Sequence, residues 1–226
     1  MGFVVARDVV REAAIADLGE EFRALCGTLI GAAAPAPLSG AMARLLASRP
    51  DIEARAYDRI RDRPGLAAFA SQPTLIDAVR SVLGSEVCLL RKIVFRIDLP
   101  RALGEYAHWH QDHFYVRGDS RTVTAWIPLQ DTGYESGCLS VMPMSHQLGP
   151  LEHTLVIGKR HVPPAALDRH SSLVPMRAGD ALLFHSCLVH ASNINWTDGI
   201  RYSVQARYIP RTGTSDPGMG GVIDVD

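Results

Sequence analysis

The sequence predicts an α+β protein, mainly β, in which N-terminal helices cover a β core of the sheet-on-sheet or barrel type. Up to Gly84, apolar residues recur at three- and four-residue spacing, the pattern of amphipathic helices. After Gly84, short segments rich in β-branched and aromatic residues alternate with turns of Gly, Pro and Asp. The chain has 226 residues and a hydrophobic content of 47%, so we expect one sizeable core and a single domain over residues 1–226.

The helical cover is expected over residues 1–84. Residues 9–30 carry an amphipathic pattern, and the loop of residues 31–40, rich in Ala and Pro, interrupts it. Further helices are predicted at residues 39–48, 51–62 and 71–84. The last of these has well-marked ends, because Pro73 suits a first helical turn and Gly84 suits the position after a helix.

The β core is expected over residues 85–210. Its candidate strands lie within residues 86–99, 121–131, 137–143, 180–185 and 200–209. Turn residues bound each of these short segments, as is typical of sheets built from many short strands. Residues 211–226 are rich in Gly and are expected to form a flexible tail.

Charge and cysteine content exclude several classes of protein. A net charge of −1 argues against a nucleic-acid-binding stripe or a polybasic membrane patch. Four scattered cysteines without a CxxC pair predict free thiols rather than a disulfide framework. The charged N-terminus does not resemble a secretion signal, and no apolar run reaches the roughly 18 residues of a membrane span. We therefore expect a cytoplasmic protein with neither nucleic acid nor membrane as a partner.

The stretch EYAHWHQDHFYV, residues 105–116, contains candidate metal ligands. On an extended strand, His108, His110 and Asp112 share one face and His113 lies on the other. An imidazole and a carboxylate two residues apart, with one distant histidine, form the 2-His-1-carboxylate triad of non-haem Fe(II) oxygenases. His-x-Asp alone occurs by chance in many proteins, so the third ligand has to be identified independently.

Two histidines in the region 180–209 are candidates for the third ligand. His185 and His190 are five residues apart, so they lie on opposite faces of a regular strand, and spacing does not choose between them. Arg201 follows on a strand with Ser203 and Gln205 in the same phase. A buried arginine needs an anionic partner, and a dicarboxylate supplies one through a bidentate contact.

Three ordered motifs resemble the phytanoyl-CoA dioxygenase-like superfamily of Fe(II)- and 2-oxoglutarate-dependent oxygenases. They are WHQD at 109–112, WIPLQDTGYESGCLSVMPMSH at 126–146 and HASNINWTDGIRYS at 190–203. The resemblance extends from about Val87 to Pro210. It implies a double-stranded β-helix, the jelly-roll fold also found in cupins, as the core beneath the helices.

The resemblance also implies roles for individual residues. His110, Asp112 and His190 become the catalytic iron ligands, and Arg201 becomes the clamp on the distal carboxylate of 2-oxoglutarate. Further cosubstrate contacts are implied for Ser192, Thr124, Trp126 and Ser203. Many relatives add a lysine on the strand before the His-x-Asp motif; Lys92 and Arg96 share a phase there, and the alignment does not choose between them.

The implied cofactors are Fe(II), 2-oxoglutarate and O2. The implied reaction is hydroxylation of an unactivated C–H bond of a small metabolite, as in natural-product tailoring, with release of succinate and CO2. Asp112 favours oxygenation over halogenation, because halogenating relatives carry a small residue at that position. Desaturation, epoxidation, cyclisation or stereoinversion at the same iron remain alternatives, and so does a catalytically inert jelly-roll binding protein.

Overall fold

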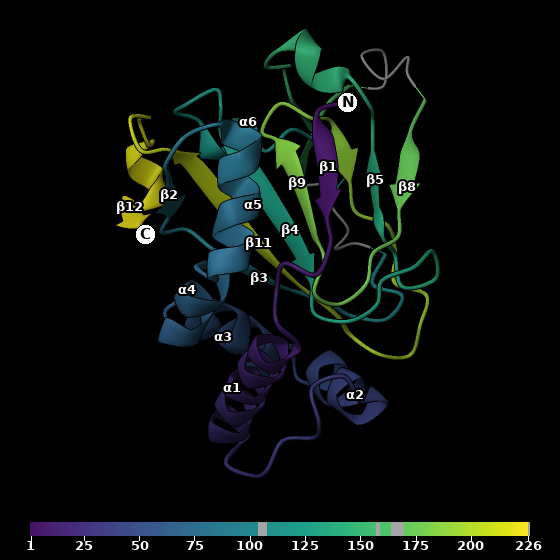
Figure 1. The fold of residues 1–226 in the computed structure, drawn as a ribbon. Helices are drawn as coiled ribbons and strands as arrows, with labels where there is room; N and C mark the ends of the chain where they lie inside the picture. The colour runs from purple at the N-terminus through teal and green to yellow at the C-terminus, as the bar shows by residue number, and fades with distance from the viewer. Residues whose placement is uncertain (104–107, 157–158, 164–169, 226) are drawn as a thin grey trace.

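The computed structural model describes residues 1–103, 108–156, 159–163 and 170–225 (Figure 1). Its helices are α1 (Glu12–Ile30), α2 (Gly40–Ser48), α3 (Pro50–Ile60), α4 (Pro64–Ala70), α5 (Pro73–Leu83) and α6 (His113–Val116). Its strands are β1 (Phe3–Ala6), β2 (Val87–Leu90), β3 (Val94–Asp98), β4 (Val123–Pro128), β5 (Leu139–Val141), β6 (Thr154–Val156), β7 (Lys159–His161), β8 (Ser172–Val174), β9 (Ala181–His185), β10 (His190–Ala191), β11 (Arg201–Pro210) and β12 (Val222–Asp224). Helices precede most of the strands, as the sequence predicts.

The N-terminal helices begin and end where their local chemistry allows. The Ser39 hydroxyl caps α2 by accepting a hydrogen bond from the backbone N–H of Met42 at 3.2 Å. Helices α3, α4 and α5 each have a proline in the first turn, where no backbone N–H is needed. Gly31 after α1 and Gly84 after α5 adopt the left-handed conformation that ends a helix. Helix α4 is an addition to the predicted set.

Two antiparallel sheets face each other across an apolar interior. The larger sheet has the order β1-β9-β4-β11-β2-β12, with β3 also paired to β11, and the smaller sheet has the order β10-β5-β8. Trp126, Leu182 and Phe184 from the larger sheet pack against Leu139 and Val141 from the smaller one. The jelly-roll prediction is therefore confirmed as a sandwich of two antiparallel sheets with helices on the outside.

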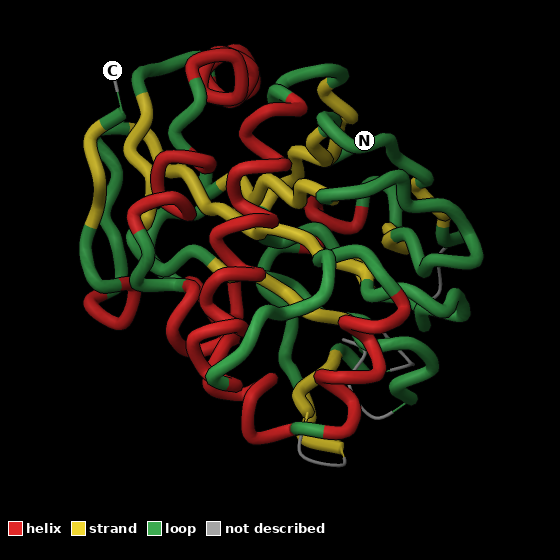
Figure 2. Tube along the Cα trace, turned by 90° about the horizontal axis from the view of Figure 1, so that it is seen from below, coloured by secondary structure: helices red, strands yellow, loops and turns green. Residues whose placement is uncertain are grey.

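The outer face of the larger sheet carries the helical layer. In Figure 1, α5 lies across this sheet and α1 to α4 gather below it, and Figure 2 shows the same layer from below. Phe22 of α1 packs against Phe95 of β3 and Tyr202 of β11, with ring centroids 5.1 and 5.3 Å apart. Strand β9 is covered on both faces and reads as a nearly continuous apolar run. Strand β11 is also buried, but its residues alternate between polar and apolar, with the apolar ones under the helices.

The C-terminal segment differs from the flexible tail that was expected over residues 211–226. Strand β12 pairs with β2 at the edge of the larger sheet, in register Val222 with Leu90 and Asp224 with Cys88. Met219 is buried against Cys88 and Leu90 of β2. The prediction of a flexible tail rested on glycine content alone. It was wrong because the glycines form turns around a short strand, β12, that pairs with a distant part of the chain.

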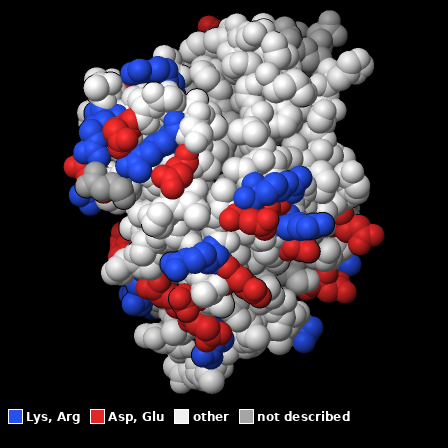
Figure 3. Space-filling model, in the orientation of Figure 1, with Lys and Arg blue, Asp and Glu red and all other residues white. Residues whose placement is uncertain are grey.

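The surface carries charges of both signs. On the face drawn in Figure 3, basic and acidic side chains intermix over the helices, in keeping with a net charge of −1. The four cysteines are free thiols and are buried, as the sequence predicts. No helix within the described ranges is both long and apolar enough to cross a bilayer.

Candidate active site

The three predicted metal ligands meet in the structure. Their ligand atoms all lie within 4.8 Å of one another. The Nε2 atoms of His110 and His190 are 3.8 and 3.9 Å from Oδ1 of Asp112. His110 and His190 come together through an isolated antiparallel bridge, in which each backbone N–H donates to the other residue's carbonyl at 2.9 and 3.0 Å.

The His-x-Asp segment is not the regular strand that the alternation argument assumed. His110 forms a single bridge, and Asp112 already has the helical backbone conformation that leads into α6. Gln111, between the two ligands, is buried and its side chain hydrogen-bonds the carbonyls of Gly149 and Cys187 at 2.9 and 2.7 Å. These bonds fasten the turn to two distant loops, so tertiary contacts rather than strand phase place the ligands together.

Both imidazoles are oriented by backbone carbonyls. Nδ1 of His110 lies 2.6 Å from the carbonyl of His108, and Nδ1 of His190 lies 3.0 Å from that of Leu188. Because a carbonyl only accepts, each Nδ1 carries the proton and each Nε2 presents its lone pair toward Asp112. Outer hydrogen bonds of this kind are typical of metal-binding histidines.

The environment sets the protonation states that a metal requires. Burial, followed by the neighbouring imidazole of His190, lowers the pKa of His110 to about 3, and burial also lowers the pKa of His190. Burial alone would raise the pKa of Asp112, but the positive charge of the Arg207 guanidinium opposes it, and that pKa lies below its usual range. Two neutral imidazoles and one carboxylate are a donor set that fits Fe(II) and leaves coordination positions open.

Asp112 divides its two oxygens between different partners. Oδ1 faces the histidines, whereas Oδ2 accepts hydrogen bonds from Thr124 Oγ1 at 2.6 Å and from Nε and Nη2 of Arg207 at 3.2 and 3.1 Å. Thr124, a predicted cosubstrate contact, donates to the carboxylate ligand in this structure. Arg207 was missed in the sequence, although it shares the strand phase of Arg201, Ser203 and Gln205.

A cavity of about 660 Å³ opens beside the triad. Trp126 and Ser192, two predicted cosubstrate contacts, line it, and so do both Lys92 and Arg96. Aromatic walls come from Phe114, Tyr115 and Phe184. A cavity of this size accommodates a small organic molecule, and its mixture of apolar walls and a few polar groups is typical of ligand sites.

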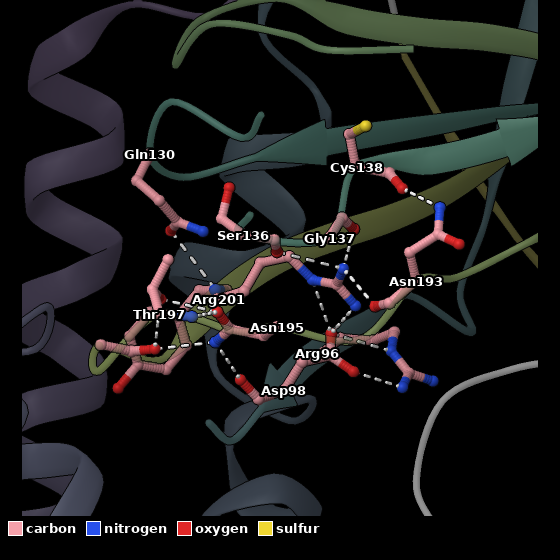
Figure 4. A network of polar contacts seen from close by, with 12 residues as sticks. Arg96, Asp98, Gln130, Ser136, Gly137, Cys138, Asn193, Asn195, Thr197 and Arg201 are labelled. Carbon is pink, nitrogen blue, oxygen red and sulfur yellow. Dashed lines mark hydrogen bonds and ion pairs between the residues drawn. The ribbon is translucent and has the colours of Figure 1, made fainter. Parts of the chain in front are cut away.

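Arg201, the predicted clamp for 2-oxoglutarate, forms an ion pair and hydrogen bonds with other residues of the chain (Figure 4). Its Nε and Nη2 lie 3.3 and 3.0 Å from Oδ2 of Asp98, and Nη1 donates to the carbonyls of Gly137 and Asn193. It is buried and is absent from the cavity lining. The anionic partner that its burial requires is thus Asp98 in this structure.

Asp98 lies between two arginines, because Arg96 also pairs with it at 2.7 Å. Burial would raise the pKa of Asp98, but the charges of Arg96 and Arg201 outweigh it and hold that pKa low. Asp98 was missed in the sequence, where its alternation with Arg96 on one strand was the available signal. Ser203, the remaining predicted contact, is buried and does not line the cavity, and its hydroxyl has no hydrogen-bond partner among the described residues.

Three further histidines considered in the sequence, His108, His113 and His185, lie outside the triad. His108 lines the cavity but is not among the clustered ligand atoms of the described residues. His113 begins α6, and its backbone N–H donates to the carbonyl of Ser186 at 2.9 Å. Nδ1 of His185 accepts from the backbone N–H of Cys187 at 3.0 Å, which is a structural role at a turn. The two-histidine, one-aspartate triad is therefore His110, Asp112 and His190.

A jelly roll that brings two histidines and an aspartate together beside a cavity defines a metalloprotein of the 2-His-1-carboxylate class. The sequence profile of the phytanoyl-CoA dioxygenase (PhyH) family matches residues 1–203. The chain therefore belongs to this family, as its motifs predict. Family membership and the triad together support iron and 2-oxoglutarate as its cofactors, in agreement with the sequence.

Curated relatives resemble parts of the chain. A 1-deoxypentalenic acid 11-beta-hydroxylase from Streptomyces exfoliatus is 30% identical over 157 residues, which cover 62% of this chain and 55% of the relative. The peroxisomal phytanoyl-CoA dioxygenase from Rattus norvegicus is 26% identical over 167 residues, covering 67% of this chain and 46% of the relative. The chain thus spans about half the length of the curated relatives that it matches.

Solved structures share the fold. The non-heme monooxygenase ThoJ is 24% identical, with a TM-score of 0.66 over 95% of this chain and 76% of that one. The α-ketoglutarate-dependent carbocyclase SnoK from nogalamycin biosynthesis is 21% identical, with a TM-score of 0.64 over 96% and 82% of the two chains. At these identities the likeness establishes the architecture, and the reaction has to be argued from the site.

Proposed function

We propose that this protein is an Fe(II)- and 2-oxoglutarate-dependent oxygenase that hydroxylates an unactivated C–H bond of a small metabolite. The observation that carries the proposal is the buried triad of His110, Asp112 and His190 beside a cavity. Bound iron supplies the oxidative chemistry, which couples the conversion of 2-oxoglutarate to succinate and CO2 with oxygenation of the substrate. The protein's own residues orient the reactants and exclude water.

The carboxylate of Asp112 supports oxygenation rather than halogenation. It is ionised, and Oδ1 points to the same place as the two imidazole Nε2 atoms. A halogenating site needs that coordination position free for a halide, whereas Asp112 fills it with a protein oxygen. Both histidines and the aspartate are held by outer hydrogen bonds, so the donor set is rigid before any ion arrives.

For 2-oxoglutarate, we propose that the distal carboxylate binds at the end of the cavity where Arg96 lies, with Arg201 behind it. Arg96 lines the cavity, and Asp98 connects it to Arg201 through two ion pairs. Ser192 and Trp126 line the wall between this arginine pair and the metal ligands in the proposed arrangement. Arginine suits the task because its planar fork matches a carboxylate.

The cavity walls favour a partly apolar metabolite as the substrate. Phe114, Tyr115 and Phe184 provide apolar surface, and the volume of about 660 Å³ leaves room for a small molecule beside the cosubstrate. The Streptomyces exfoliatus relative is described as a 1-deoxypentalenic acid 11-beta-hydroxylase. We therefore favour a small tailoring substrate.

Anaerobic addition of Fe(II) and 2-oxoglutarate tests the proposal directly. The wild-type protein is expected to give a weak visible charge-transfer band, and His110→Ala is expected to lose it because one of three protein ligands is gone. His170→Ala, which removes an exposed histidine, is the matched control and should keep the band. A wild-type protein that binds neither iron nor 2-oxoglutarate would contradict the proposal.

The reaction type is read from the product in a second experiment. Candidate metabolites are incubated with the loaded protein in air, and succinate and product masses are measured. A gain of one oxygen atom supports hydroxylation, a loss of two hydrogen atoms indicates desaturation or ring closure, and an unchanged mass with altered stereochemistry indicates epimerisation. Absence of succinate across a broad panel, in a protein that does bind iron, would favour an inert binding protein.

A further inference from the structure

Arg207 is a buried basic side chain that hydrogen-bonds the carboxylate of the triad. Its Nε and Nη2 both donate to Oδ2 of Asp112, at 3.2 and 3.1 Å. Thr124 Oγ1 donates to the same oxygen at 2.6 Å. Asp112 thus has one oxygen, Oδ2, held by three donors, while the other, Oδ1, faces the histidine nitrogens.

The sheet register explains why these donors meet. Arg207 of β11 is paired directly with Thr124 of β4, so the two side chains stand next to each other on the inner face of the larger sheet. Arg207 is 7% exposed, and its Nη2 also donates to Oε1 of Gln205 at 3.0 Å. The guanidinium is therefore held by its own strand as well as by Asp112, and it lies at the edge of the cavity.

We propose that Arg207, with Thr124, is a positioning residue that makes Asp112 a ligand through Oδ1 alone. A carboxylate that chelated the metal through both oxygens would have to withdraw Oδ2 from three donors. That withdrawal would leave the buried guanidinium without its anionic partner, which is costly. A carboxylate held to one ligand atom keeps a coordination position open for the cosubstrate and dioxygen.

The position of the guanidinium fits the same role. Arg207 donates to Oδ2 of Asp112, whereas Oδ1 faces the histidines. The carboxylate of Asp112 therefore lies between the guanidinium and the position of the metal. We therefore expect the gain from orienting the ligand to outweigh the repulsion between the guanidinium and the metal.

A purely structural role is the competing explanation. A buried ion pair between β11 and the turn before α6 would contribute to folding without affecting the metal. The two roles differ in their effect on a bound ion. The proposed role changes the affinity and coordination of the metal, whereas the structural role changes the stability of the metal-free protein alone.

Titration with Co(II), followed by its visible spectrum under anaerobic conditions, separates the two roles. Arg207→Gln is expected to weaken Co(II) binding by about 10- to 100-fold and to change the spectrum, because Asp112 is free to rotate. Arg207→Lys should recover part of the affinity, since one charged donor returns. Arg121→Gln is the matched control: this exposed arginine pairs with Asp119 at the surface, and its loss should leave Co(II) binding unchanged.

A second variant keeps the test decisive if Arg207→Gln fails to fold. Thr124→Val has a similar shape, retains the ion pair and removes one donor to Oδ2, so it should weaken Co(II) binding in the same direction but less. Wild-type affinity and spectrum in a folded Arg207→Gln variant, or in Thr124→Val where Arg207→Gln does not fold, would overturn the inference. The inference rests on the proposed function for the metal itself: a wild-type protein that binds no divalent ion would refute that function instead.

Discussion

At the scale of single residues, Asp98 is the side chain that most changes the interpretation of the site. The motif order assigns Arg201 to the distal carboxylate of 2-oxoglutarate, yet Asp98 already occupies Nε and Nη2 of that arginine. Asp98 is ionised and buried, and Arg96 also pairs with it. An incoming dicarboxylate therefore competes with a fixed carboxylate for the same guanidinium groups.

Replacing this carboxylate with an amide tests the competition. Asp98→Asn should bind 2-oxoglutarate about tenfold more tightly, because a like charge beside the anion is gone and the fork of Arg201 is released. The affinity is measured from the charge-transfer band in anaerobic Fe(II) titrations. Asp119→Asn, at a surface ion pair, is the control for an Asp-to-Asn change. Weaker 2-oxoglutarate binding in Asp98→Asn would mean that Asp98 supports the cosubstrate site rather than competing for it.

At the scale of elements, the turn before β5 shows how a backbone position supports the arginine. Gly137 has a φ of +77°, and its carbonyl accepts a hydrogen bond from Arg201. A Cβ at this position would lie 2.5 Å from the carbonyl oxygen of Asn193 and 2.6 Å from Nη1 of Arg201. Glycine is therefore required both by the left-handed backbone and by the close approach of Arg201.

Alanine at this position is expected to destabilise the fold. Gly137→Ala should lower the free energy of unfolding by about 1–3 kcal/mol, the range for a non-glycine residue held in an unfavourable backbone conformation. Gly133→Ala, four residues earlier in the same connection, meets nothing within 4 Å and should change stability by less than about 0.5 kcal/mol. Urea denaturation of both variants makes the comparison. Equal stability of the two variants would contradict this account of the turn.

At the scale of the whole molecule, the helical layer supports the sheet that carries the site. Phe22 of α1 is fully buried against Phe95 and Tyr202, and the Tyr202 hydroxyl donates to the carbonyl of Pro37 at 3.0 Å. Tyr202 follows Arg201 on β11 but points to the opposite face of the sheet. One strand therefore holds the arginines of the site on one face and anchors the helices on the other.

Truncation of this aromatic contact tests the coupling between the two layers. Phe22→Ala should lower the free energy of unfolding by about 3–5 kcal/mol, since it removes a fully buried ring and leaves a cavity. Val82→Ala removes an exposed apolar side chain from α5 and should have little effect. Thermal and urea unfolding of the metal-free proteins provide the measurement. A loss below about 1 kcal/mol in Phe22→Ala would show that the helices fold independently of the sheet.

Hydrophobic periodicity in the sequence predicted those helices and strands that depend on residues close together in the chain. Periodicity predicted four of the helices and the change to strands, because burial of one face imposes a 3.6- or 2-residue repeat. Helix α4 was missed, since its seven residues are too few to establish a period. Strand β12 was missed because its pairing with β2 involves residues more than 130 positions away in the chain.

The sequence by itself determined the class of fold, the family and the donor set of the metal site, because motif order and residue chemistry are written along the chain. The tertiary structure decided which partners these residues have. Register places Thr124 beside Arg207, and packing places Asp98 against Arg201. Neither contact can be read from spacing, since strands from distant parts of the chain bring the residues together. Only the tertiary structure therefore shows that Arg207 pairs with Asp112 and that Asp98 pairs with Arg201.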